Sequence, residues 1–406
     1  MNKKVCVIGL GYIGLPTASI LASSGFDVAG CDINPDVVES VNSGECHIVE
    51  PGLDLYLKEA VKSKKLNAFI HPSPADIYIL CVPTPFKSGT KSDIQSPNID
   101  YVMQAAQSII DLLKEGDVVI LESTSPVGTT EKIAKLFEKN NIDIESINIA
   151  YCPERVLPGN IMDELINNDR IIGGINSSSC IKTKEFYETF VEGNIYLTDT
   201  KTAELCKLTE NSFRDLNIAF ANQLSLICED ESVNVKELIG LANKHPRVNI
   251  LSPGIGVGGH CIPVDPWFII SKNPKNSDLL KLARDINNKK TSWIINKIEE
   301  DIYKYSEKNN IKPKVACLGL SYKPNIDDLR CSPAEEIVNS LKDKGHELIV
   351  VEPNVSNHPD YNVFSLNDAL KIADIFFILV GHDEFKSTNF KDRKVIDFCG
   401  ILDHVI

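Results

Sequence analysis

Short runs of consecutive apolar residues recur along the first half of the chain, as in KKVCVIGLG, ADIYILCVPTP and INIAYCPER. Between them, as over residues 13–24, apolar residues recur at helical spacing. Such runs are typical of strands buried on both faces, and their alternation with helices predicts a parallel, doubly wound sheet. Ligands of these sheets bind beyond the carboxyl ends of the strands. The side chains expected there are Thr84, Ser123, Thr124, Glu154 and Arg155.

From about Lys201 the strand pattern gives way to helical periodicity, first in KTAELCKLTENSFRDLNIAFANQLSLICEDESV and then in VKELIGLANKH. A second helical segment, from about Asp278 to Asn309, is charged and contains neither glycine nor proline. At 1.5 Å per residue it would extend roughly 45 Å, which is long enough to connect two lobes.

Strand–helix alternation resumes near residue 312 with KPKVACLGLSYKP and continues to the end. Ser332 is a plausible N-cap before a helix that begins with Pro333. Gly319 and Glu352 weakly repeat the glycine-turn and acidic-residue order of the N-terminus, which suggests two nucleotide-like sites. We therefore expect an α/β fold with two Rossmann-like parallel-sheet domains joined by a central helical domain with a long connecting helix. The expected boundaries are 1–198, 199–311 and 312–406.

Composition narrows the function classes. The chain has 406 residues, 43% of them hydrophobic, and a formal net charge of -14. That charge disfavours generic binding to nucleic acid or to anionic membranes, although backbone amides can still bind a small anion. The 12 cysteines include no CxxC pair, the N-terminus lacks the pattern of a signal peptide, and no segment approaches the ~20 apolar residues of a membrane span. We expect a reduced, cytoplasmic protein.

The segment GLGYIG follows the first predicted strand and opens a helix, and Asp32 ends the second strand. This context favours a dinucleotide site, with a pyrophosphate on the helix N-terminus, Gly11 allowing close approach and Asp32 binding ribose hydroxyls. The carboxylate would repel a 2′-phosphate, so NAD is expected rather than NADP. The alternative is a tight turn without a ligand.

Cys261 lies in GVGGHCIPVDPWFI, a loop framed by glycines and prolines. It has three interpretations. It is a buried structural thiol, a metal ligand together with His260, or a nucleophile for which Asp265 orders a water or takes a proton. No further metal ligands are evident in the sequence, so we predict no metal site.

Three other polar segments are uninformative by pattern alone, because a solvated face or loop is their default interpretation. They are Lys207, Asn211 and Arg214 on one helix face, His245 and Arg247 in HPRVN, and Tyr322 and Lys323 in SYKP.

Essentially the whole chain resembles the nucleotide-sugar dehydrogenases that oxidise a UDP-hexose to its uronic acid. The motifs that carry the resemblance are GLGYIGLP, CVPTP, ESTSPVGTT, PERVLPG, AELCKLTENSFRDLNIAFANQL, GVGGHCIPVDPWF and GLSYKPNIDDLRCSPA. VGGHCI followed by VDPWF is similar to the subgroup that acts on UDP-N-acetylhexosamines, and most similar to the UDP-N-acetyl-D-mannosamine dehydrogenases. UDP-N-acetylglucosamine and UDP-glucose are the alternative substrates.

The resemblance implies a role for each matching residue. The catalytic set is Cys261 as nucleophile, Lys207 for oxyanions or protons, Asn211 and Asp265 as assistants, and Thr124 and Glu154 for water and proton handling. NAD would contact Gly9, Gly11, Tyr12, Ile13, Gly14, Asp32, Thr84, Thr124 and Arg330. The UDP-sugar would contact Arg155, Val156, Lys207, Asn211, Arg214, His245, Arg247, Gly258, Tyr322 and Lys323.

The family also implies a homo-oligomer, dimeric or larger, formed through the central helical domain, and an arginine such as Arg247 can come from the neighbouring subunit. Two departures stand out. NPDVV after Asp32 lacks the arginine often found near the NAD ribose, and DFCG carries Cys399 where relatives have a basic residue.

The implied reaction explains a need for a thiol, because oxidising a primary alcohol to a carboxylate removes four electrons and each NAD accepts two. Cys261 would hold the aldehyde as a thiohemiacetal and then as a thioester. Two other function classes stay open. They are a two-electron hydroxyacid dehydrogenase, which needs no thiol, and a non-catalytic protein that senses NAD or a nucleotide.

Overall fold

The computed structural model of the chain describes residues 3–87, 94–390 and 393–402. The contacts within it divide the chain into two compact units. Unit 1 comprises residues 1–210 and 267–273, and unit 2 comprises residues 211–266 and 274–406.

Unit 1 is built on one sheet of eight strands in the order β3-β2-β1-β4-β5-β6-β7-β8. The strands are β1 (Lys4–Ile8), β2 (Asp27–Cys31), β3 (Leu66–Phe69), β4 (Ile77–Leu80), β5 (Val118–Leu121), β6 (Asn148–Tyr151), β7 (Arg170–Gly174) and β8 (Ile195–Asp199). The first six are parallel, as predicted. The last pair departs from this parallel arrangement, because β7 runs antiparallel to β6 and β8 is parallel to β7. A buried strand is apolar in either direction, so its pattern does not reveal its orientation.

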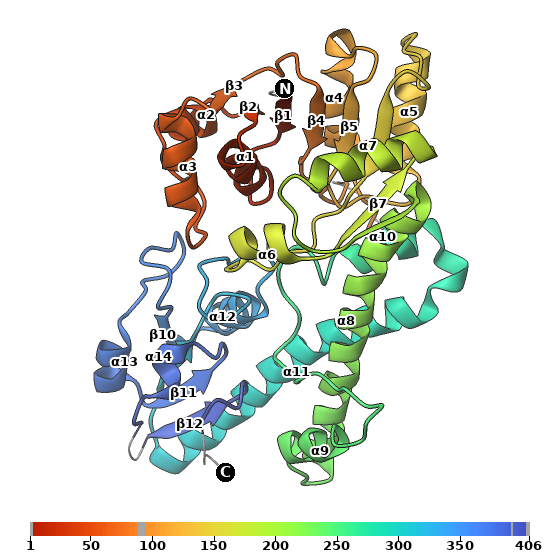
Figure 1. Cartoon of the computed structure of the whole chain (residues 1–406). Coiled ribbons are helices and arrows are strands. Elements are labelled where there is room, and N and C mark those ends of the chain that lie inside the picture. Colours follow the sequence, from red (N-terminus) through yellow and green to blue (C-terminus); the bar gives the residue numbers. More distant parts are fainter. Residues whose placement is uncertain (1–2, 88–93, 391–392, 403–406) are drawn as a thin grey trace. The chain divides into compact units, whose positions relative to one another are not determined.

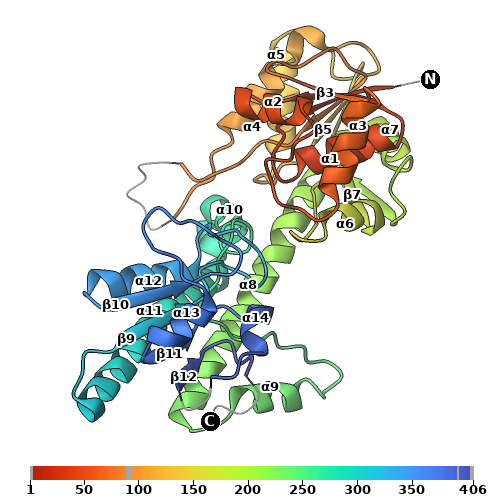
Figure 2. The ribbon, with the colours of Figure 1, turned by 90° about the vertical axis from the view of Figure 1, so that its left-hand side faces the viewer.

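Both faces of this sheet are covered by helices (Figure 2). The helices of unit 1 are α1 (Gly14–Ser23), α2 (Pro35–Asn42), α3 (Leu53–Lys62), α4 (Asp100–Gln107), η1 (Ile110–Leu112), α5 (Thr129–Lys139), α6 (Ile161–Asn167) and α7 (Ser177–Tyr187). The side chains of β1 alternate between two apolar clusters. Val5 and Val7 join the cluster that includes α1 and α3, whereas Cys6 and Ile8 join the cluster that includes α4 and α5. Burial on both faces explains the uninterrupted apolar run in the sequence.

Unit 2 contains a four-stranded parallel sheet in the order β10-β9-β11-β12. Its strands are β9 (Lys314–Leu318), β10 (Glu347–Val351), β11 (Ile375–Ile378) and β12 (Lys394–Asp397), and its helices include α9 (Val235–Ala242), η2 (Pro274–Asn276), α12 (Pro333–Asp343), α13 (Leu366–Ile372) and α14 (Asp383–Lys386). Apolar clusters again cover both faces, with α12 on one side and α13 on the other.

The long helix predicted over 278–309 is α11 (Asp278–Asn309), the cyan helix of Figure 1. Its 32 residues extend roughly 48 Å. Ile294, Ile298 and Ile302 pack into the cluster on one face of the small sheet. The predicted fold class, with two Rossmann-like sheets and a long helix, is confirmed.

Two helices cross the boundary between the units, α8 (Thr200–Asp230) and α10 (Asp265–Lys272). Within unit 2, α8 and α11 meet through buried polar groups. Arg284 Nη1 donates to Asp215 Oδ1 at 2.5 Å, and Asn287 Nδ2 donates to the same oxygen at 2.8 Å. Burial raises the pKa of Asp215, against the lowering effect of Arg284. Among the described residues, no helix combines the length and the apolar character needed to cross a membrane.

Candidate active site

The turn between β1 and α1 requires glycine at two positions for steric reasons. A Cβ on Gly14 would lie 1.8 Å from Gly9 O, and one on Gly9, whose φ is +92°, would lie 2.5 Å from Cys81 O. A Cβ on Gly11 would meet nothing within 4 Å, so that side of the turn is open. Helix α1 has neither a side-chain cap nor an acidic residue in its first turn. An uncapped helix start beside an open glycine suits a pyrophosphate, and these residues fit NAD.

Asp32 follows β2 and is held at this turn by two backbone amides. Leu10 N donates to its Oδ2 and Asn34 N to its Oδ1, each at 2.9 Å. The side chain stays half-buried. A carboxylate oxygen has two lone pairs, so both oxygens retain capacity for ribose hydroxyls. Ile33, the next residue, is 83% exposed and presents an apolar surface beside the acid.

Thr84 and Thr124 come together beyond the ends of β4 and β5. Thr84 Oγ1 donates to Thr124 O at 2.7 Å, and Ser123 Oγ donates to Val82 O at 2.7 Å. β1 and β4 are neighbours in the sheet, and the strands that follow each of them are added in opposite directions. The carboxyl ends of β1 and β4 therefore mark the switch point where such sheets bind ligands. The predicted residues Gly9, Thr84 and Thr124 therefore belong to one edge.

Glu154 is held from three directions within unit 1. Arg170 Nη1 donates to its Oε2 at 2.7 Å, Arg155 N donates to its Oε1, and Lys207 Nζ donates to its backbone oxygen at 2.6 Å. Burial alone would lower the pKa of Arg170, but Glu154 beside it raises that pKa, so the guanidinium stays charged. The Glu154 carboxylate and the Lys207 ammonium are thus fixed in place relative to each other.

Arg155 and Val156 follow Glu154 in the loop after β6. Arg155 forms a two-pronged pair with Glu210, with Nε to Oε2 at 3.1 Å and Nη2 to Oε1 at 2.7 Å. Its Nη1 also donates to Asp169 O at 3.2 Å. Val156 packs against the apolar cluster around α1. A substrate phosphate that binds Arg155 would share the guanidinium with Glu210.

Asn211 and Asp265 meet in unit 2. Asn211 Nδ2 donates to Asp265 Oδ2 at 2.6 Å, and the two residues are only 8% and 2% exposed. A solvated face is the default interpretation of the pattern around Asn211, but its side chain is buried. The amide of Asp265 donates to Cys261 O at 2.9 Å, so the half-buried cysteine sits immediately before α10. The structure therefore places Cys261 and Asp265 in one short segment, with Asn211 bonded to Asp265 from α8.

The glycines before Cys261 let Tyr322 pack against the backbone. A Cβ on Gly258 would lie 2.6 Å from Tyr322 Cβ, and one on Gly259, whose φ is +86°, would lie 2.9 Å from Tyr322 Cε2. Gly259 N also donates to Arg330 O at 3.0 Å. Lys323 is half-buried, and the exposed Arg330 forks onto Asp328. Gly258, Tyr322 and Arg330 are thus neighbours, and they combine a residue predicted for NAD, Arg330, with two predicted for the UDP-sugar.

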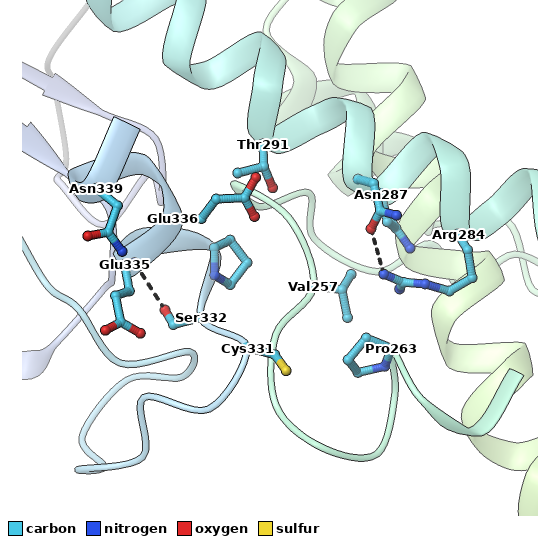
Figure 3. A pocket seen from close by; sticks show the side chains of 12 residues that line it. Val257, Pro263, Arg284, Asn287, Thr291, Cys331, Ser332, Glu335, Glu336 and Asn339 are labelled. Carbon is cyan, nitrogen blue, oxygen red and sulfur yellow. Dashed lines mark hydrogen bonds between the residues drawn. The ribbon is translucent and has the colours of Figure 1, made fainter. Parts of the chain in front are cut away.

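A cavity of about 400 Å³ lies on another side of the same glycine segment (Figure 3). Val257 and Pro263 border it from the segment, Arg284 from α11, and Ser332 from the start of α12. The segment is therefore not closely packed where it faces this cavity. Within the described residues, no group of three or more His, Cys, Asp or Glu is placed to hold a metal ion.

The remaining predicted residues of unit 2, Arg214, His245 and Arg247, are exposed. His245 Nδ1 accepts from Arg247 N at 3.3 Å, which folds HPRVN into a local turn. The glycine turn, Asp32, Thr84, Thr124, Glu154, Arg155, Val156 and Lys207 belong to unit 1, and the other predicted residues belong to unit 2.

Comparison with known protein families decides the identity of the chain. Three domains of the UDP-glucose/GDP-mannose dehydrogenase family match it in order, the NAD binding domain at residues 3–191, the central domain at 201–289 and the UDP binding domain at 316–404. The chain belongs to the UDP-glucose/GDP-mannose dehydrogenase family.

Relatives within this dehydrogenase family match over nearly the full length. A UDP-N-acetyl-D-mannosamine dehydrogenase of Campylobacter jejuni is 49% identical, covering 98% of this chain and 100% of the relative. One of Escherichia coli K12 is 48% identical, covering 98% of each. The solved structure of a UDP-D-ManNAc dehydrogenase from Pyrococcus horikoshii has a TM-score of 0.90 at 39% identity, covering 99% of this chain and 96% of that one.

Sequence reasoning about this family member missed the buried partners of its candidate residues. Arg170, only 2% exposed, pairs with Glu154 and stacks over Tyr187 at 5.2 Å. Tyr187 OH donates to Glu122 at 2.6 Å, and burial raises the pKa of Glu122. Charged residues at the ends of apolar strands were the available signal, but nothing in the sequence pairs them.

Proposed function

We propose that this protein is an NAD-dependent dehydrogenase that oxidises the C6 hydroxymethyl group of UDP-N-acetyl-D-mannosamine to a carboxylate. The main support is the 48–49% identity to UDP-N-acetyl-D-mannosamine dehydrogenases over 98% of the chain. The alternative is a UDP-N-acetylglucosamine or UDP-glucose 6-dehydrogenase. The choice of sugar rests on that identity.

NAD supplies the hydride acceptor, and two molecules are needed because the oxidation removes four electrons. Gly9, Gly11 and Gly14, with Tyr12 and Ile13 between them, would receive the pyrophosphate, and Asp32 would bind the ribose. Thr84 and Thr124 would line the same edge. Arg330 of unit 2 would complete the contacts with the cofactor.

Cys261 acts in this proposal as the nucleophile. Its thiolate adds to the C6 carbonyl carbon of the aldehyde, forming a C–S bond, and Lys207 stabilises the charge that develops on the oxygen. C6 of the thiohemiacetal must then lose a hydride, which a second NAD would accept, to reach the thioester level, and a water attacks the same carbon. The C–S bond then breaks, Cys261 leaves as the thiolate, and the product is a carboxylate.

Asn211 and Asp265 assist as a pair. The buried Asp265 carboxylate accepts from Asn211 and lies at the start of the helix that follows Cys261, which suits it to hold a water or take a proton. Glu154 has its carboxylate oriented by Arg170, and with Thr124 it would serve the water and proton path. The residues proposed for the UDP-sugar are Arg155, Val156, Lys207, Asn211, Arg214, His245, Arg247, Gly258, Tyr322 and Lys323.

An apolar stripe on α8 supports assembly into a homo-oligomer. Phe213, Phe220 and Ile227 recur every seven residues on this helix and are 63%, 53% and 50% exposed. Such a spacing keeps three large apolar side chains on one helix face, which is typical of helix–helix packing. We propose a second copy of this chain as the occupant, with Arg247 reaching the neighbouring site. Phe220→Asp should shift the sedimentation coefficient towards the monomer, and an unchanged value would contradict the proposal.

We also propose the division into domains 1–198, 199–311 and 312–406. It is supported by the end of β8 at Asp199 and the end of α11 at Asn309. The 12 cysteines all lie in the described residues and are thiols rather than disulfides, which supports a cytoplasmic location.

The test is the amount of NADH formed per UDP-sugar consumed, measured with a panel that includes UDP-N-acetyl-D-mannosamine, UDP-N-acetylglucosamine and UDP-glucose. We expect two NADH per UDP-N-acetyl-D-mannosamine and slower or no turnover of the others. Cys261→Ser should stall after the aldehyde or at a slow ester, whereas two NADH per sugar at the normal rate would remove the covalent role. One NADH per substrate would favour a two-electron dehydrogenase, and NAD binding without turnover would favour a sensor.

A further inference from the structure

His382 is a buried polar side chain that none of the proposed steps uses. It is 1% exposed and lies just before α14, with Phe385 packed edge-on against its ring at 5.3 Å. An imidazole in such a place needs hydrogen-bond partners, because an unsatisfied buried polar group costs about 1–3 kcal/mol.

Its hydrogen bonds define which ring nitrogen carries the proton. Asn325 N donates to Nδ1 at 3.0 Å, and a backbone amide can only donate, so Nδ1 is the acceptor. Nε2 then carries the hydrogen and donates to Glu352 Oε2 at 3.1 Å. The ring therefore accepts at Nδ1 and donates at Nε2, and it also contacts Asn354 Nδ2, 3.1 Å from Nδ1, and Ser321 Oγ, 3.4 Å from Nε2.

Through these two bonds, His382 holds both ends of the loop formed by residues 320–325, one directly at Asn325 and the other by way of Glu352. At its start, Glu352 Oε2 accepts from Leu320 N at 2.7 Å and from Ser321 N at 3.0 Å. At its end, Asn325 has a left-handed φ of +63°, and its amide is the one bound to His382. His382 and Glu352 together thus clamp this loop at both ends.

The centre of the clamped loop is Tyr322, whose side chain packs so closely on Gly258 and Gly259 that a Cβ on either would lie 2.6 Å or 2.9 Å from it. Cys261 lies two residues after Gly259 in the same segment. Pro333 and Thr291 also approach this segment at Gly256, whereas the segment borders the cavity at Val257 and Pro263. All of these residues lie within unit 2.

We infer that His382 is a positioning residue that, with Glu352, fixes the 320–325 loop and through Tyr322 the backbone that presents Cys261. This inference rests on the proposed role of Cys261 as nucleophile. A clamp of this kind sets the attack geometry, and displacement of a reacting atom by 1 Å can cost about a hundredfold in rate.

The experiment compares His382→Phe with His382→Gln and with a matched control. Phenylalanine keeps the ring but leaves Asn325 N and Glu352 without their partner, whereas the glutamine amide can donate to one and accept from the other. His358 provides the control, because its Nδ1 accepts from Asp360 N at 3.2 Å and its Nε2 contacts Glu335 at 3.1 Å in the same bonding pattern. His358→Phe therefore removes a backbone-amide contact and a carboxylate contact of the same kinds from another part of the same unit.

Two readouts are measured on the full-length protein, kcat with NAD and UDP-N-acetyl-D-mannosamine, and hydrogen–deuterium exchange of peptides covering residues 254–264. We expect His382→Phe to lower kcat by about 10- to 100-fold and to accelerate exchange in this segment, including the Gly259 amide. His382→Gln should recover most of the wild-type kcat and most of the protection from exchange. His358→Phe should lose a comparable amount of thermal stability, but its kcat and exchange rate should stay within about twofold of the wild type.

Equal kcat and equal exchange in His382→Phe and His358→Phe would overturn the inference. If His382→Phe does not fold, His382→Asn replaces it, since the shorter amide can reach only one of the two partners. If the wild type forms no NADH from any UDP-sugar, the proposed function fails, and the exchange of residues 254–264 alone then decides whether His382 holds the segment.

Discussion

The turn from β1 to α1 and the turn from β9 to α12 use an acid at the same place in two different ways. In both, the acid ends the second strand and accepts a hydrogen bond from the residue after the first glycine, Leu10 N to Asp32 and Leu320 N to Glu352. Asp32 remains half-buried and open to a ligand. Glu352 is only 3% exposed, and His382 and Ser321 N also bind its Oε2.

The two helices that follow differ in the same sense. Helix α1 starts without a side-chain cap, whereas Ser332 Oγ caps α12 by accepting from Ala334 N at 3.2 Å. Glu335 and Glu336 occupy the first turn of α12 and add negative charge there. The start of α1 can thus bind an anion, whereas Ser332 and two acidic side chains already occupy the start of α12. Recognition of UDP would therefore depend on loop residues such as Tyr322 and Lys323 rather than on a helix start.

The largest effect is expected for Gly14→Ala in the first turn. Its methyl group would lie 1.8 Å from Gly9 O, a backbone atom that cannot move without opening the turn. The free energy of unfolding should fall by about 4 kcal/mol or more, measured by urea denaturation. Gly11→Ala is the control, since its methyl group meets nothing within 4 Å. It should fold normally and raise the KM for NAD, and equal stability loss in both variants would contradict this account.

A smaller effect is expected from acidification of the second turn. Burial works against ionisation of Glu352, but the bond from His382 and the Leu320 and Ser321 amides lower its pKa to about 2. Stability from this carboxylate is therefore present above its ordinary pKa of roughly 4.3 and is lost as the pH falls towards 2. Glu352→Gln should be about 3 kcal/mol less stable than the wild type at pH 7.

That difference should shrink progressively between roughly pH 4.5 and pH 2, followed by urea unfolding of both proteins across this range. A constant difference would show that the carboxylate charge does not stabilise the turn. The KM for NAD of Glu352→Gln at pH 7 should match that of the wild type, in contrast to substitutions of Asp32.

Asp32→Asn tests the open acid of the pair. The amide keeps the size and one acceptor but loses the charge that, in the proposed site, would bind ribose hydroxyls and repel a 2′-phosphate. The KM for NAD should rise by about tenfold, equivalent to about 1.4 kcal/mol, and the preference for NAD over NADP should fall by a similar factor. Steady-state kinetics with both cofactors measure it, and an unchanged preference would remove Asp32 from the ribose site.

Ser332→Ala gives the smallest expected effect, about 1 kcal/mol in the free energy of unfolding, because it removes the side-chain cap of α12. Thermal unfolding monitored by circular dichroism measures the loss. No substitution at the start of α1 can remove a side-chain cap in the same way, because its N-cap residue, Ile13, makes no capping hydrogen bond. Activity should be retained in Ser332→Ala, and a large fall in kcat would mean that this helix start has a role beyond stability.

Much of the fold was predictable from local pattern. The apolar run of β1 is buried on alternating faces, the glycine turn follows it directly, and the glycine-free segment 278–309 is one helix. These features depend on residues that are close in the sequence. The reversed direction of β7 was not predictable, since a buried strand carries no signal of its orientation.

The candidate site shows the same division. Residue types in a glycine loop single out Cys261 and Asp265, and the order of turn and strand singles out Gly11 and Asp32. The partners of such residues came only with the fold. Asn211 and Asp265 are 54 positions apart, and Arg170 is 16 positions from Glu154. In each pair the two residues lie in different elements or loops, so local periodicity does not relate them.

What the sequence determined by itself is the order of strands and helices, the open glycine turn and the position of the thiol, because periodicity and glycine geometry are properties of neighbouring residues. What the tertiary structure decided is which polar groups are used up inside the protein. Asp32 and Glu352 are equivalent in the linear pattern, yet one remains open and the other is buried against His382. Burial and hydrogen bonding depend on distances in space, and a chain of residue types does not contain them.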